Sequence, residues 1–197
     1  NLERVYNNLG KIHREQGDYK AALINYRKAL DMELNYDSPE EITVAKYYNS
    51  IGQVYYVQGC HTDASIEFEE CLTIHRKISP KDHSDLATTY TNIGLIHYRQ
   101  FHYDAALDCF KKTLTIQLAL HPSECPWIST SYENIAWTLF RQEKLTEALD
   151  YMKKAYEITV NNFSAEHERS KQCQQWIVQL ERKSSMDYSR EKMNLGL

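Results

Sequence analysis

Apolar side chains recur along this chain at helical spacing. The spacing is close to i, i+3, i+4 and i+7, which places side chains on one face of a helix, and we expect that face to be buried. The first set is Tyr6, Leu9, Gly10 and His13, and the second is Ala22, Tyr26, Ala29 and Leu30. No stretch alternates with period two, so the sequence predicts an all-α fold without a sheet.

This two-helix pattern repeats along the chain without insertion or deletion. Leu9, Ile51, Ile93 and Ile135 are each 42 positions apart, and so are Ala22, Ala64, Ala106 and Ala148. Turn signals stand between the helices of a unit, and Pro39, Pro80 and Pro122 stand between units, where proline can open a helix but not continue one. The chain therefore predicts four helix-turn-helix repeats, at approximately 3–36, 40–78, 82–120 and 126–162.

A small residue lies in the middle of each first helix. These residues are Gly10, Gly52, Gly94 and Ala136. Glycine costs about 0.5–1 kcal/mol relative to alanine in a helix, so its recurrence indicates that the second helix of the unit comes too close for a side chain. Large residues, Tyr26, Phe68 and Phe110, then fill the space between neighbouring units.

The pattern resembles the tetratricopeptide repeat (TPR) family. Tyr6-x2-Leu9-Gly10-x2-His13 followed by Ala22-x3-Tyr26 is similar to the aromatic-x2-Leu-Gly-x2-Tyr and Ala-x3-Phe signature of that family. The period is longer than the usual repeat of about 34 residues. That length, and the segments 85–93 and 103–107, resemble the kinesin light chain type. The resemblance implies a right-handed TPR superhelix, an α-solenoid of four repeats plus a C-terminal capping helix.

The C-terminal part of the chain predicts a cap and a tail. Ile177 falls on the period, so 165–183 is expected to form a last helix of the first type, begun by Ser164 as its cap. A terminal helix with a polar outer side closes the core of a helical repeat array. We therefore expect a TPR domain over 1–183 and a flexible C-terminal tail over 184–197.

In the TPR family the first helices line a concave groove, which implies a set of ligand-facing residues here. They are the positions directed away from the core of each unit: Asn7, Asn8, Lys11, Asn49, Gln53, Asn92, Leu95, Arg99, Asn134, Trp137 and Arg141. Asparagine can donate to and accept from a peptide backbone, although it can equally solvate the groove or contact the next helix. Trp137 is either a ligand anchor or a packing contact with the capping helix.

Composition and motifs argue against several other functions. The net charge of −4 over 197 residues does not favour nucleic acid, and no apolar run is long enough to span a membrane. The five cysteines form no Cys-x-x-Cys pair, and the eight histidines show no zinc spacing. No nucleophile and base are placed together. We therefore expect a cytoplasmic, non-catalytic protein without metal or cofactor.

The predicted function is a protein–protein interaction scaffold. It would bind a peptide or partner segment in the concave groove, as an adaptor or cargo-recognition module. Two alternatives stay open: a structural spacer or self-association module, and a regulatory appendage of a larger protein, including an enzyme. The chain starts at Asn1 and not at methionine, so we expect it to be an excerpt. The partner and the oligomeric state do not follow from the sequence.

Overall fold

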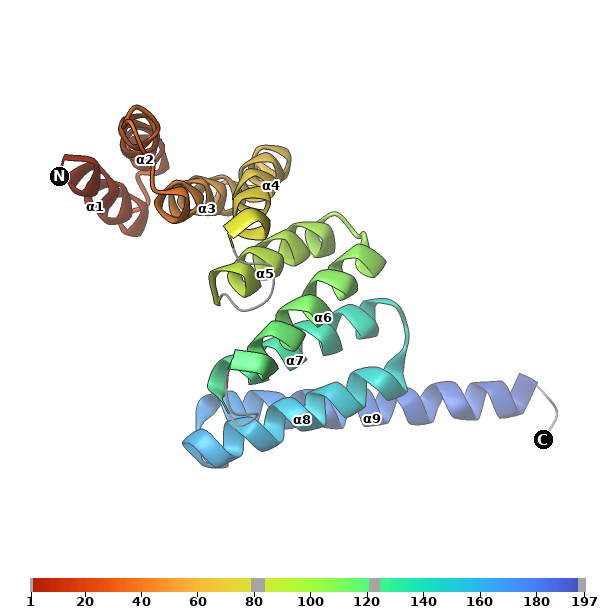
Figure 1. Cartoon of the computed structure of the whole chain (residues 1–197). Helices are drawn as coiled ribbons and strands as arrows, with labels where there is room; N and C mark the ends of the chain where they lie inside the picture. Colours follow the sequence, from red (N-terminus) through yellow and green to blue (C-terminus); the bar gives the residue numbers. More distant parts are fainter. Residues whose placement is uncertain (1, 79–83, 121–124, 195–197) are drawn as a thin grey trace. The chain divides into compact units, whose positions relative to one another are not determined.

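The computed structural model describes residues 2–78, 84–120 and 125–194, with side chains through Met186. Within these ranges the chain forms nine α-helices and no strand (Figure 1). The helices are α1 Leu2–Glu15, α2 Tyr19–Leu34, α3 Glu41–Val57, α4 His61–Ile78, α5 Ser84–Arg99, α6 Tyr103–Leu120, α7 Pro126–Arg141, α8 Leu145–Phe163 and α9 Glu168–Asn194. They form two compact units, Asn1–Gln100 and Phe101–Leu197, and each is described by itself. The predicted all-α class is confirmed.

The helices pack in the order in which they follow one another. In the first unit α1 packs against α2, α2 against α3, α3 against α4, and α4 against α5. In the second unit α6 packs against α7, α7 against α8, and α8 against α9. Three predicted repeats, 3–36, 40–78 and 126–162, each correspond to one helix pair. The helices of the third repeat, α5 and α6, belong to different units.

A left-handed residue closes the turn inside each repeat. Gly17 and Gly59 have φ near +79° and +78°, a region that glycine enters without steric cost. Phe101 and Glu143 stand at the same repeat position with φ near +65° and +62°. Residues with a side chain are uncommon in that region, so these two positions depart from the glycine of the first two repeats. Pro80 and Pro122, expected to separate repeats, lie outside the described residues.

The recurrent glycine marks a close helix approach, as predicted. A Cβ atom placed on Gly10 would lie 2.7 Å from the Tyr26 ring, and one on Gly52 would lie 2.7 Å from the Phe68 ring. These distances are shorter than any normal carbon–carbon contact. The aromatic residue of the second helix therefore packs directly on the glycine of its own repeat.

Buried polar contacts link successive repeats at a constant position. The His75 ring and the Thr89 hydroxyl lie 3.2 Å apart between α4 and α5. One repeat later, the Ser131 hydroxyl donates to the Gln117 side chain at 2.6 Å between α6 and α7. These contacts satisfy polar groups inside the junctions, where an unpaired group would cost about 1–3 kcal/mol.

The C-terminal helix differs from its prediction at both ends. It begins at Glu168 and not at 165, because Ser164 is the C-cap of α8, with φ near +90° and its N–H donating to the Val160 carbonyl. It also continues to Asn194, so the expectation of a flexible tail from residue 184 is wrong for residues 184–194. No glycine or proline interrupts this stretch, and adding residues to an existing helix is easy once it is nucleated. Residues 195–197 lie outside the described ranges.

Candidate functional site

The first unit presents a row of mostly polar side chains, with one leucine, from its three first helices. We call this row the polar face: Asn7, Asn8 and Lys11 of α1, Asn49 and Gln53 of α3, and Asn92, Leu95 and Arg99 of α5. Asn8, Lys11 and Arg99 are exposed, and the other five are half-buried. None of the eight belongs to the buried core, which agrees with their expected direction away from it.

Several members of the polar face bond to the neighbouring first helix. The Asn92 amide donates to the Asn49 side-chain oxygen at 2.8 Å, joining α5 to α3. The Arg14 guanidinium donates to the Gln53 oxygen at 2.6 Å, joining α1 to α3. Arg99 donates to the Tyr56 hydroxyl at 3.4 Å. The expectation that asparagine contacts the next helix is therefore met by Asn49 and Asn92.

This amide pair, Asn49 and Asn92, keeps part of its hydrogen-bonding capacity. The bond uses one N–H of Asn92 and one lone pair of the Asn49 oxygen. Among the described residues, no side-chain bond occupies the Asn49 NH2 group or the Asn92 oxygen. The pair can thus donate from one side chain and accept at the other, which matches the one donor and one acceptor of a peptide group.

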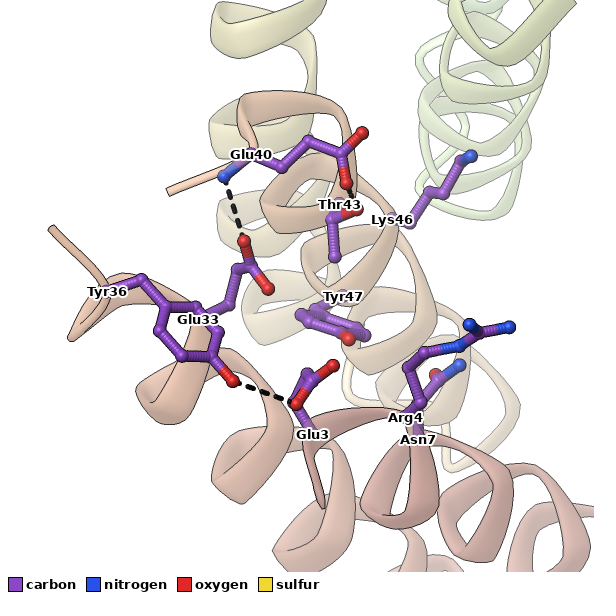
Figure 2. A pocket seen from close by; sticks show the side chains of 9 residues that line it. All are labelled: Glu3, Arg4, Asn7, Glu33, Tyr36, Glu40, Thr43, Lys46 and Tyr47. Carbon is purple, nitrogen blue, oxygen red and sulfur yellow. Dashed lines mark hydrogen bonds between the residues drawn. The ribbon is translucent and has the colours of Figure 1, made fainter. Parts of the chain in front are cut away.

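A pocket of about 500 Å³ opens at the α1 end of the same face (Figure 2). The α1 helix, the end of α2, and the start of α3 with the loop before it supply its walls. Its lining residues are Glu3, Arg4, Asn7, Glu33, Tyr36, Glu40, Thr43, Lys46 and Tyr47. Of these, Asn7 is a predicted groove residue, so the pocket and the polar face share this side chain.

Hydrogen bonds fix the acidic side of the pocket. The Tyr36 hydroxyl donates to Glu3 at 3.0 Å, the Glu40 backbone N–H donates to Glu33 at 2.8 Å, and Thr43 donates to Glu40 at 2.6 Å (Figure 2). These bonds hold three carboxylates in place within one small volume. The pocket is therefore pre-organised around a cluster of oxygen acceptors.

The pKa shifts in the pocket follow from these contacts. Desolvation raises the pKa of Glu3. Hydrogen bonds from backbone N–H groups and from the Tyr36 hydroxyl lower it by more, so the net shift of the pKa is downward. The bond to Glu3 raises the pKa of Tyr36, and burial followed by the charges of Glu33 and Glu3 raises that of Tyr47. At neutral pH both tyrosines keep their protons and Glu3 is ionised.

Sequence reasoning missed most of this pocket. One signal was available, because Glu3 stands where the later repeats have Ala45, Ala87 and Ser129. A charged residue at a position that is otherwise small and buried marks a local departure from the repeat. Glu3 is indeed buried, with 5% of its surface exposed.

In the second unit, α9 covers the corresponding residues of α7. The Trp137 and Trp176 rings meet edge to face with centroids 3.9 Å apart, and Phe140 packs beside them. Arg169 of α9 binds Glu133 at 2.8 Å and the Thr130 hydroxyl at 2.6 Å. Of the two expectations for Trp137, the structure places it in a packing contact with the last helix.

The other two predicted residues of α7 are placed differently. Asn134 is half-buried, and its carbonyl accepts a bond from Thr138 within the helix. The exposed Arg141 guanidinium lies over the rings of Phe101 and Tyr103, at 5.9 and 5.5 Å from their centroids. The second unit therefore does not assemble an open row of polar groups like that of the first.

The described ranges carry neither a metal-ligand cluster nor a membrane-spanning helix. In those ranges, histidine, cysteine, aspartate and glutamate side chains do not gather in threes that could hold a metal ion. Likewise, the helices described there are all too short or too polar to cross a membrane.

Comparison with known proteins assigns the family. Models of the tetratricopeptide repeat match residues 3–36, 43–119 and 103–159, whereas no curated protein matches the sequence. Among solved structures, BtubC (BKLC) from P. vanneervenii has a TM-score of 0.76 at 15% identity over 91% of this chain and 78% of that one.

Two further structures are similar in fold. A Podosopora anserina protein described as a kinesin light chain with nearly identical TPR-like repeats has a TM-score of 0.79 at 14% identity, over 96% of this chain and 90% of that one. The apo form of RapI has a TM-score of 0.80 at 17% identity, over 94% of this chain and 65% of that one. Since the repeat models match most of its length, this chain belongs to the tetratricopeptide repeat family.

Proposed function

We propose that this chain is a non-catalytic scaffold that binds an extended peptide segment of a partner protein on the polar face of the first unit. Tetratricopeptide repeats are generally protein-interaction modules without catalysis, which supports the class of function. The amide pair of Asn49 and Asn92 is the observation that carries the location.

The amide pair suits a peptide backbone in two ways. Its internal bond fixes both side chains, so less conformational entropy is lost when a ligand binds. The free donor of Asn49 and the free acceptor of Asn92 then pair with the acceptor and donor of a ligand peptide group. Such contacts recognise any sequence, so side-chain selectivity has to come from elsewhere on the face.

The pocket beside Asn7 supplies that selectivity in this proposal. It is large enough for one side chain of the ligand, and its three fixed carboxylates can accept hydrogen bonds from that side chain. Arg4 and Lys46 add two cations to the lining. The second unit contributes less, because α9 occupies Glu133 and Trp137 of α7. The ligand thus lies along α1, α3 and α5, and the chain acts as an adaptor or cargo-recognition module.

The test begins with a random peptide library selected on the 197-residue protein. Selected peptides are then titrated by calorimetry against the parent and the Asn49→Ala/Asn92→Ala variant. We expect the variant to bind at least about tenfold more weakly, because each lost amide leaves a peptide group unpaired. The matched control is Asn25→Ala on α2, whose side chain, among the described residues, bonds only to the Ala21 carbonyl of its own helix.

Two outcomes would contradict the proposal. One is a library selection that yields no peptide above background. The other is a set of peptides that bind the parent and the double variant with equal affinity while both proteins melt alike.

A further inference from the structure

The pocket beside Asn7 lies at the junction of α2 with α3, where the later junctions are closed by a polar bond. At the positions one and two repeats further along the chain, the two side chains bond to each other: His75 with Thr89 at 3.2 Å, and Gln117 with Ser131 at 2.6 Å. In the first junction these positions hold Glu33 and Tyr47, which do not bond to each other, and both line the pocket. The first junction is thus built differently from the later two.

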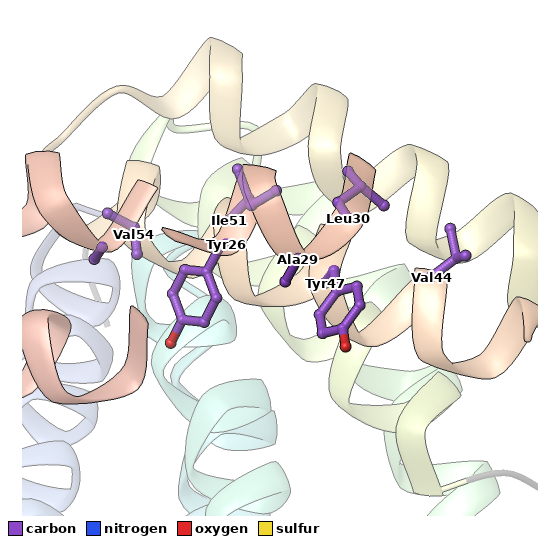
Figure 3. Packing of buried hydrophobic residues seen from close by; sticks show 8 residues of the cluster. Tyr26, Ala29, Leu30, Val44, Tyr47, Ile51 and Val54 are labelled. Atoms are coloured by element: carbon purple, nitrogen blue, oxygen red, sulfur yellow. The ribbon is translucent and has the colours of Figure 1, made fainter. Parts of the chain in front are cut away.

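Tyr47 presents a buried hydroxyl to this pocket. Its ring belongs to the apolar cluster between α2 and α3, with Ala29, Leu30 and Val44 (Figure 3). Only 3% of its surface is exposed, and its hydroxyl forms no hydrogen bond among the described residues. The packed ring holds the hydroxyl at the pocket wall, where the charge of Glu33 acts on it (Figure 2). Since buried polar groups are nearly always paired, this hydroxyl indicates a ligand group that bonds to it.

The pocket also holds buried carboxylates without a counter-ion. Glu3 and Glu33 are 5 and 6% exposed. Their bonding partners are neutral, the Tyr36 hydroxyl for Glu3 and the Glu40 backbone N–H for Glu33, and neither carboxylate forms an ion pair among the described residues. Charged groups that are buried in proteins are usually paired with an opposite charge. The chemistry of the pocket therefore favours a cationic guest.

The spread of the acceptors favours a guanidinium group over other cations. Within the described ranges, Glu3, Glu33 and Glu40 do not come together closely enough to hold a metal ion. A lysine ammonium is likewise a compact point charge. A guanidinium offers five N–H donors in one plane, so it can bond to acceptors that lie apart. The volume of about 500 Å³ accommodates a side chain of that length.

We propose that this pocket binds an arginine side chain of the partner peptide. The guanidinium bonds to the carboxylates of Glu3 and Glu33, and the Tyr47 hydroxyl accepts one of its N–H groups. This inference rests on the proposed function, because the peptide on the polar face supplies the arginine. Asn7 belongs to both the face and the pocket lining, so a peptide on the face passes the pocket.

The test titrates single-residue probes into the 197-residue protein and follows NMR shifts at Thr43 and Tyr47. The probes are the N-acetyl N-methylamide derivatives of arginine, lysine and citrulline, the last being the neutral analogue of arginine. The N-terminal amino group is acetylated beforehand, because its charge also acts on Glu3. We expect the arginine probe to bind at least about tenfold more tightly than the citrulline probe, since only arginine makes charge-assisted bonds.

Matched substitutions locate the effect in the pocket. Glu33→Gln keeps an acceptor for the Glu40 N–H but loses the charge, so it should weaken the arginine probe by at least about tenfold. Lys46→Met should strengthen arginine binding by about twofold, because it removes an exposed cation from the lining. Glu41→Gln, exposed on α3 and outside the lining, is the control and should leave the affinity unchanged.

Three results would overturn the proposal. Equal affinities of the parent for the arginine and citrulline probes would exclude a cation site, and this comparison decides even where Glu33→Gln does not fold. An arginine affinity that folded Glu33→Gln leaves unchanged would exclude the pocket. A lysine probe that binds as tightly as arginine would exclude guanidinium recognition.

The probes also separate this inference from the proposed function. A single residue does not require the amide pair of Asn49 and Asn92, so its titration tests the pocket alone. An arginine preference together with a failed peptide selection would contradict the proposed function and support the pocket. Selected peptides that depend on the amide pair, with no arginine preference among the probes, would contradict only the inference about the pocket.

Discussion

The outward faces of the first helices differ between the two units. In the first unit, Asn49 of α3 and Asn92 of α5 bond to each other, and no helix among the described residues closes over them as α9 closes over α7. In the second unit, Glu133 and Trp137 of α7 stand under α9, bound by Arg169 and Trp176. One repeat position can thus serve an open surface or a closed junction, and the neighbouring helix decides which.

A second difference concerns the close approach inside a repeat. In the first unit glycine faces an aromatic ring, as Gly52 faces Phe68. In the second unit Ala136 and Met152 stand at these two positions, and both are buried. Methionine is unbranched and adapts its shape, so a repeat with methionine can accept the extra methyl group.

The largest effect is expected where α9 covers α7. Trp176→Ala should lower the free energy of unfolding by about 2–3 kcal/mol, because it empties the contact with Trp137 and Phe140. Trp127→Ala is the matched control, and with 61% of its surface exposed it should cost only about 0.5 kcal/mol. Urea unfolding followed by circular dichroism measures both, and equal losses would show that α9 does not close this face.

The glycine contact should give the next largest effect. Gly52→Ala should cost about 1–3 kcal/mol, since the new methyl group collides with the buried Phe68 ring. Adding Phe68→Met should recover part of that loss, because it recreates the Ala136 and Met152 combination. Thermal melts of the single and double variants test this, and a double variant that is less stable than Gly52→Ala would refute the explanation.

The ion pair between α7 and α9 should matter less. Arg169→Met should cost about 1–2 kcal/mol, because it leaves the half-buried Glu133 without its cationic partner. Lys153→Met breaks the pair with Glu181, in which both side chains are about half exposed, and should change stability by about 0.5 kcal/mol or less. Urea unfolding at low salt compares the stability of the two variants. If Arg169→Met loses as little stability as Lys153→Met, α9 is held by its aromatic residues alone.

The smallest effect belongs to the open face. In a double-mutant cycle, Asn49→Ala and Asn92→Ala should show a coupling of only about 0.5–1 kcal/mol in stability. Both amides are half-buried, so water can replace part of the lost bond. A coupling above about 2 kcal/mol would mean that the amide pair is chiefly structural, and the polar face of the first unit would then resemble the closed one of the second.

Much of the fold followed from local pattern. The 42-residue period located the helix pairs of the first, second and fourth repeats, because apolar spacing and turn residues act within a few positions of the chain. Gly10 and Gly52 indicated the close approach of two helices before the partner ring was known. The directions of Asn49, Gln53 and Asn92 also followed, because helical geometry fixes the face on which a residue stands.

Tertiary structure decided what covers each face. Trp137 had two open roles, and only the path of α9 brought Trp176 against it. The pocket at Glu3 depends on Tyr36 and Glu33, which lie about one helix pair further along the chain and carry no periodic signal. The pattern predicts that Leu9 is buried, which is wrong in this structure. Leu2, Val5, Leu9 and Ile12 share one face of α1, and all four side chains are exposed. Spacing along a helix sets which residues share a face, whereas burial and bonding require a partner segment whose position the local pattern does not encode.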